Sequence, residues 1–86
     1  MARYSIEIKQ SASKEIEKLP KGDLKVVLTK IESLASNPRP HGCIKLSAQE
    51  RYRIRCGQYR ILYMILDHVL VVTIVKVAHR KDVYRS

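Results

Sequence analysis

The side chains in this sequence that are best suited to binding or catalysis are the arginines of a short alternating segment, residues 51–56. Arginine occupies every second position there, and apolar or small residues occupy the positions between. In a strand this pattern places the guanidinium groups on one face and the apolar side chains on the other. Guanidinium groups are planar, permanently charged forks that match phosphate oxygens. The row Arg51, Arg53 and Arg55 therefore predicts a face that binds a polyanion.

Further polar side chains follow where a folded sheet would bring them near this row. Arg60 opens a second strand after a tight turn at Gly57-Gln58. Arg80 comes directly after the last predicted strand. Tyr84 lies four residues further on, close enough to share a site if this tail forms a turn of helix. The adjacent imidazole of His79 could transfer protons at neutral pH, and we rank it behind Tyr84 in that role.

Plainer interpretations compete with this chemistry. The arginine row is also consistent with a solvated strand face, or with a docking surface for an acidic protein segment. Four tyrosines alternate with apolar residues and are expected in the core: Tyr4, Tyr52, Tyr59 and Tyr63. Two histidines fall in a loop and a turn, where solvent exposure is expected: His41 and His68.

Length and composition limit the class of protein. With 86 residues the chain is predicted to form one domain. The formal net charge is +9; residues 37–86 carry ten basic and three acidic side chains, and residues 1–36 carry seven and five. This asymmetry predicts a basic functional half with an anionic partner. No signal peptide or membrane span is predicted, since the longest apolar run, Val69 to Val75, is too short.

The two cysteines, Cys43 and Cys56, form no C-x-x-C pair. They suggest neither a disulfide framework nor a zinc site, and no metal ligand set is predicted elsewhere. A reducing, cytoplasmic setting is therefore expected, with Cys56 as a small core residue.

The elements that must position these residues follow from hydrophobic periodicity. Residues 2–9 alternate as a half-buried strand, and Ser11 is the expected N-cap of a short helix that ends at Pro20. Apolar residues at helical spacing between positions 24 and 34 predict a second, amphipathic helix. The prolines of Asn37-Pro38-Arg39-Pro40 end that helix.

The second half of the chain is predicted to form a meander. A loop with a short extended piece at 44–46 leads into three strands, which are predicted at 51–56, 59–66 and 69–77. Asp67-His68 is the expected turn between the last two strands. The fold class is α+β: two N-terminal helices packed on a four-stranded, mainly antiparallel sheet in the order βααβββ.

Together these features resemble the RelE-type toxins of the RelE/ParE superfamily, the toxic halves of bacterial toxin–antitoxin pairs. The resemblance covers nearly the whole chain, as a single RelE-like toxin domain, 1–86. It implies a fold similar to that of microbial ribonucleases. The segments that carry it are Ser11–Pro20, Asn37-Pro38, Lys45-Leu46, Tyr52–Arg55, Gly57–Arg60 and Val77–Arg85.

Position by position, the resemblance implies roles for individual side chains. The implied catalytic residues are Arg53, Arg55, Arg60, Arg80 and Tyr84. Positions 53 and 55 are lysine in some relatives, so here a group that can give up a proton is replaced by one that barely can. Neighbouring side chains are expected to contact RNA: Arg51, Lys45, Lys81, His79 and Arg85.

The resemblance implies a metal-independent endoribonuclease, without a cofactor, that cleaves messenger RNA in the A site of the 70S ribosome and so inhibits translation. The RNA 2′-hydroxyl would attack the neighbouring phosphate while guanidinium groups stabilise the developing charge. A cognate antitoxin would neutralise the toxin, and operator DNA would be bound only by the complex. The alternatives are a ParE-like inhibitor of DNA gyrase with the same fold, a nucleic-acid-binding module without chemistry, and an inactive relic kept for autoregulation.

Overall fold

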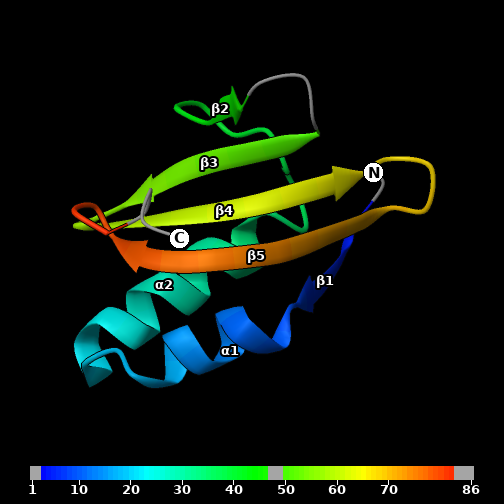
Figure 1. The fold of residues 1–86 in the computed structure, drawn as a ribbon. Coiled ribbons are helices and arrows are strands. Elements are labelled where there is room, and N and C mark those ends of the chain that lie inside the picture. Colours follow the sequence, from blue (N-terminus) through cyan, green and yellow to red (C-terminus); the bar gives the residue numbers. More distant parts are fainter. Residues whose placement is uncertain (1–2, 47–49, 83–86) are drawn as a thin grey trace.

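The computed structural model describes residues 3–46 and 50–82 (Figure 1). The chain begins with a strand, continues through two helices, and ends with four strands. In chain order the elements are β1 (Ser5–Ile8), α1 (Gln10–Glu17), α2 (Lys21–Ser33), β2 (Ile44–Leu46), β3 (Arg51–Cys56), β4 (Tyr59–Leu66) and β5 (Val71–His79).

The strands form one five-stranded mixed sheet in the order β1-β5-β4-β3-β2. β1 runs parallel to β5, and the other three pairs of neighbours are antiparallel. The α+β class, the two helices and the meander are confirmed. The predicted four-stranded sheet in the order βααβββ is wrong in detail, because the short extended piece at 44–46 is a fifth strand that pairs with β3.

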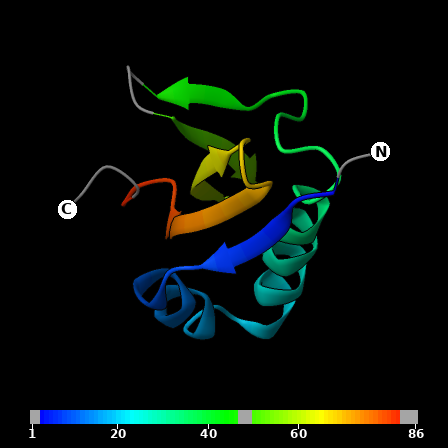
Figure 2. The ribbon, with the colours of Figure 1, turned by 90° about the vertical axis from the view of Figure 1, so that its right-hand side faces the viewer.

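Both helices pack on one face of the sheet (Figure 1, Figure 2). The core lies between them and alternate residues of the central strands. α1 contributes Ala12 and Ile16, and α2 contributes Val27 and Ile31. The buried strand residues face them: Tyr52, Ile54, Cys56, Ile61, Tyr63, Ile65, Val72, Ile74 and Val77. Within the described ranges no helix covers the opposite face of the sheet, and that face carries the arginine row.

Several predicted boundaries are wrong. The first strand runs from Ser5 to Ile8 instead of 2–9, and the last strand runs from Val71 to His79 instead of 69–77. The first helix begins at Gln10 after Lys9, and Ser11 makes no capping bond. The reason is that the N–H of Lys9 still bonds the carbonyl of Ile74, so the helix starts as soon as the strand pairing ends. The last strand begins at Val71 instead of Val69, because residues 67–70 form the turn and Leu70 adopts a left-handed φ of 56°.

The loop after α2 is tied to the sheet by polar contacts. The buried Tyr63 donates its hydroxyl proton to the carbonyl of Pro38 at 2.8 Å. Arg39 forms an ion pair with Asp67 at 2.8 Å and donates through Nε to the Tyr52 hydroxyl at 3.1 Å. These bonds raise the pKa of Arg39 and lower the pKa of Asp67 to about 2. The loop that leads to β2 is therefore fixed against the β4–β5 turn.

A carboxylate closes the outer edge of β5 where β1 ends. Glu15, on α1, accepts the backbone N–H of Val77 at 3.0 Å and an ion pair from Lys76 at 3.2 Å. The side chain thus satisfies a strand N–H that has no neighbouring strand to bond.

No helix in the described part of the chain is long and apolar enough to cross a membrane.

Candidate functional site

The arginine row lies on the open face of β3, as predicted. Tyr52, Ile54 and Cys56 are buried toward the helices, while the arginines between them are exposed or half-buried. The strand forms over residues 51–56 because apolar and charged residues alternate strictly, and each set keeps to one face.

Arg60 brings the row together with a second strand and with the turn after β5. It pairs directly with Arg55 in the β3–β4 register, so the two side chains lie on the same face. Partial burial lowers the pKa of Arg60, and the charges of Arg55, Arg53 and Arg80 lower it further. The other three arginines therefore lie around Arg60, and we call the four of them the arginine cluster.

Arg80 reaches this cluster because the turn that carries it is bonded to the β3–β4 turn. Its backbone N–H donates to the carbonyl of Gln58 at 2.7 Å. Gly57-Gln58 is the tight two-residue turn predicted from the sequence, and Gly57 adopts a left-handed φ of 60°. Two chain segments about 20 residues apart thus hold Arg60 and Arg80 at one end of the sheet.

A hollow of about 270 Å³ opens beside the cluster, where β2 ends and the edge of β3 is free. Its walls are Arg53, Arg55 and Arg60 together with Lys30, His41, Gly42, Ile44 and Ile54. The sequence did not indicate Lys30 or His41, because one is an ordinary exposed-face position of an amphipathic helix and the other lies in a loop. Both add donors to a hollow whose size and charge suit a phosphate or a nucleotide.

Other predicted site residues lie away from the cluster. Arg51 shares the open face at the outer end of the row, two positions from Arg53 and four positions from Arg55, or about 13 Å from Arg55 along a strand. Lys45 pairs with Tyr52 in the β2–β3 register and so lies on the helix side of the sheet. Lys81 is exposed in the turn after β5. Tyr84, a predicted catalytic residue, and Arg85 lie outside the described residues. RNA contact by Arg51, Lys45, Lys81 and Arg85 stays a prediction.

His79 also faces away from the arginines. It pairs with Tyr59, whose position alternates with that of Arg60, so both rings lie on the helix side. Its two ring nitrogens are already bonded, Nε2 to the Gln58 side chain at 3.0 Å and Nδ1 to the N–H of Lys81 at 3.2 Å. This placement leaves neither nitrogen of His79 ready to take a proton from a substrate on the open face.

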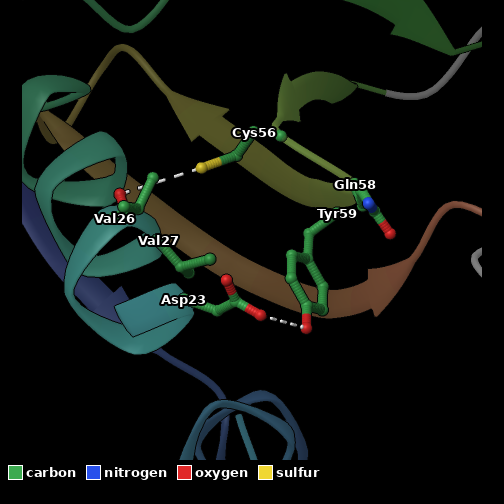
Figure 3. Close-up of a pocket in the computed structure, with 7 residues that line it drawn as sticks. Asp23, Val26, Val27, Cys56, Gln58 and Tyr59 are labelled. Carbon is green, nitrogen blue, oxygen red and sulfur yellow. Dashed lines mark hydrogen bonds between the residues drawn. The ribbon is translucent and has the colours of Figure 1, made fainter. Parts of the chain in front are cut away.

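A second pocket, of about 350 Å³, lies on the helix side between α2 and the β3–β4 turn (Figure 3). Cys56 lines it, as the buried small residue that the sequence predicted; its Sγ donates to the carbonyl of Val26 at 3.7 Å, and burial raises its thiol pKa. Tyr59 points across the pocket and donates its hydroxyl proton to Asp23 at 2.8 Å. Both cysteines are free thiols.

Comparison with known proteins places this chain among toxins. Residues 6–84 match the family described as "ParE toxin of type II toxin-antitoxin system, parDE". A Methanocaldococcus jannaschii protein named as toxin RelE1 is 28% identical in an alignment of 88 positions that covers 98% of each chain.

Solved structures agree with this placement. The RelE–RelB complex of Pyrococcus horikoshii contains a chain with a TM-score of 0.82 and 28% identity, covering 100% of both chains. The RelBE2 complex of Mycobacterium tuberculosis contains one with a TM-score of 0.81 and 28% identity, covering 91% of this chain and 99% of that one. The chain belongs to the RelE/ParE superfamily of toxins from type II toxin–antitoxin systems.

Proposed function

We propose that the protein is a metal-independent endoribonuclease that cleaves messenger RNA in the ribosomal A site. The observation that carries this proposal is the arginine cluster, in which Arg60 is surrounded by the charges of Arg53, Arg55 and Arg80. Like charges placed this close destabilise the free protein, so a fold that brings them together is suited to an anion that offsets their repulsion. A phosphodiester at the moment of cleavage is such an anion.

The cluster can do most of the work of phosphodiester cleavage by electrostatics. The RNA 2′-hydroxyl attacks the adjacent phosphorus, its proton leaves to a base, and the 5′-oxygen departs with a proton, which yields a cyclic phosphate and a free 5′-hydroxyl. Negative charge gathers on the phosphoryl oxygens, and Arg60 and Arg80 are the donors assigned to it. Arg53 and Arg55, with Lys30 and His41 along the adjoining hollow, hold the flanking backbone.

The hydrogen bonds of His79 are one reason to expect that RNA cleavage by this protein depends on the ribosome. Both ring nitrogens of His79 are occupied, so this imidazole is not ready to accept the 2′-hydroxyl proton on the open face. His41 lines the arginine hollow but is exposed in a loop. A site rich in charge stabilisation and poor in general bases is expected to depend on the ribosome to align the RNA for in-line attack.

The proposal includes a cognate antitoxin as the physiological partner in the cytoplasm. Structures of similar chains from Pyrococcus horikoshii and Mycobacterium tuberculosis are complexes with RelB-type partners. An antitoxin segment with carboxylates would match the cluster and compete with RNA for it. Operator DNA would be bound by the toxin–antitoxin complex.

A second candidate is inhibition of DNA gyrase, which the description of the matched family as ParE toxins favours. This activity requires no cluster of phosphate-binding arginines at the end of the sheet. Arg60→Ala would then leave toxicity unchanged, whereas it would abolish toxicity that results from RNA cleavage.

The test is primer extension on a defined messenger in a purified translation system, with free RNA and a gyrase supercoiling reaction run in parallel. We expect cuts at the A-site codon of programmed ribosomes, and Arg60→Ala is expected to slow them by about 10²–10³-fold. Lys25→Ala is the matched control, because it removes one charge from an exposed site on α2 outside the hollow. Loss of supercoiling without RNA cuts would overturn the nuclease proposal.

A further inference from the structure

The turn that carries Arg80 is held by four hydrogen bonds that meet at His79 and Gln58. Gln58 accepts twice, through its backbone carbonyl from the N–H of Arg80 at 2.7 Å and through Oε1 from the imidazole at 3.0 Å. His79 in turn accepts at Nδ1 from the N–H of Lys81 at 3.2 Å, and its carbonyl accepts from the N–H of Asp82 at 2.8 Å. Each residue of the turn is thus fixed by a partner.

This geometry determines the form of the imidazole. A backbone N–H can only donate, so Nδ1 of His79 must carry a lone pair where it faces Lys81. The ring proton is then on Nε2, where the Gln58 Oε1 accepts it. A neutral ring with its proton on Nε2 satisfies both bonds at once, and protonation of Nδ1 would set two donors against each other.

The ring of Tyr59 packs against the imidazole of His79. The edge of one ring meets the face of the other at a centroid distance of 5.9 Å and an interplanar angle of 80°, a favourable aromatic geometry. The Tyr59 hydroxyl is anchored on Asp23 in the first turn of α2 (Figure 3). This hydrogen bond to a carboxylate is the main reason that the pKa of Tyr59 is raised, so the phenol remains the donor. The connection therefore runs from α2 through Tyr59 and His79 to Arg80.

We propose that His79 is a positioning residue, which, with Gln58, holds Arg80 in the arginine cluster by keeping its proton on Nε2. A positioning device is needed there because the charges of Arg80 and Arg60 repel each other. Without a fixed turn, the exposed Arg80 would relax away from Arg60 into solvent. The catalytic consequence rests on the nuclease proposal, whereas the positioning itself does not.

Two variants of His79 differ in which of the bonds made by its ring nitrogens they remove. His79→Ala removes both bonds. His79→Asn keeps an oxygen attached to Cγ where Nδ1 is attached, so it can still accept from the N–H of Lys81 in an Asx-type turn. Lys25→Ala again serves as the exposed control on α2.

The first measurement is made on the free protein. Long-range ¹H–¹⁵N NMR of the imidazole is expected to show a neutral ring protonated at Nε2, and amide hydrogen exchange at Arg80 is expected to accelerate in His79→Ala and to recover in His79→Asn. A ring protonated at Nδ1, or exchange at Arg80 that is unchanged in His79→Ala, would overturn the proposal. Neither readout requires any RNA.

The second measurement is the ribosome cleavage assay. His79→Ala is expected to lower kcat by about 10- to 10²-fold with a small change in KM, because Arg80 is displaced while the rest of the surface still binds. His79→Asn is expected to recover most of the loss. Full activity of His79→Ala would overturn the positioning role. If the wild-type protein cleaves nothing, the nuclease proposal fails, and the NMR and exchange data still decide whether His79 holds the turn.

Discussion

Tyr63→Phe removes one hydroxyl from the centre of the molecule. The Tyr63 side chain is fully buried, and its ring stacks on that of Tyr52 with centroids 5.8 Å apart. Its hydroxyl donates to the carbonyl of Pro38 at 2.8 Å, and burial raises its pKa. The substitution keeps the ring and its packing, so the change isolates the contacts of one hydroxyl, chiefly its hydrogen bond from β4 to the loop after α2.

The expected cost follows from what remains after the change. Pro38 is buried, so its carbonyl keeps the desolvation of the folded state and loses its side-chain donor. A buried acceptor left without a partner costs about 1–3 kcal/mol. In a domain of this size each kcal/mol lowers Tm by about 4–8 °C, so a fall of about 4–24 °C is expected.

Urea unfolding followed by circular dichroism gives the free energy of unfolding, and an unchanged m-value would show that the variant buries the same surface. Tyr4→Phe is the matched control, since the Tyr4 hydroxyl donates to an exposed carboxylate, Asp67, that also accepts from Arg39. We expect a smaller fall in Tm for that variant. A Tyr63→Phe protein within about 0.5 kcal/mol of wild type would refute a role for this bond in fixing the loop.

Two further predictions concern the turns. Hydrogen bonds from Arg39 and Tyr4 lower the pKa of Asp67 to about 2, so its contribution to stability is complete above about pH 4 and is lost as the pH falls to about 2. Across that window, the Tm of Asp67→Asn should change less with pH than the Tm of wild type, as measured by thermal melts at each pH. Gly57→Ala should lower the free energy of unfolding in urea by about 1–3 kcal/mol, because φ is 60° there and residues with a Cβ rarely adopt that conformation. No atom lies within 4 Å of the added methyl group, so this cost comes from the backbone alone. An unchanged midpoint would contradict this interpretation of the turn.

The sequence predicted the central part of the sheet well, and the reasons are local. β3 and β4 have the predicted bounds, because their apolar residues alternate and the glycine at Gly57 marks the turn between them. β2 has three residues, too few for a period to show. The parallel pairing of β1 with β5 joins segments more than 60 residues apart, and nothing in either segment alone determines it.

For the candidate site too, local spacing predicted some residues, and others are placed only by long-range packing. The arginines of β3 and β4 could be placed on one face from their spacing, and this placement is confirmed. Lys45 was grouped with them, yet its register against Tyr52 puts it on the other side of the sheet. Lys30 and His41 join the hollow only through the packing of α2 and the loop against β3, which local spacing does not reveal. His79 was considered as a proton-transfer group because an imidazole can transfer protons at neutral pH, and the bonds that occupy both of its nitrogens are invisible in the sequence.

The carboxylate of Glu15 on the edge of β5 has a consequence for how this protein behaves at high concentration. A free strand edge is a template onto which another chain can add, and repetition of that step leads to fibres. Here Glu15 already takes the Val77 N–H, and its ion pair with Lys76 holds it there. The opposite margin of the sheet is β2, whose three residues offer little length for a foreign strand. One margin of the sheet thus consists of the four-residue β1 with the Glu15 carboxylate beyond it, and the other of the three-residue β2, so little strand edge is left onto which another chain could add.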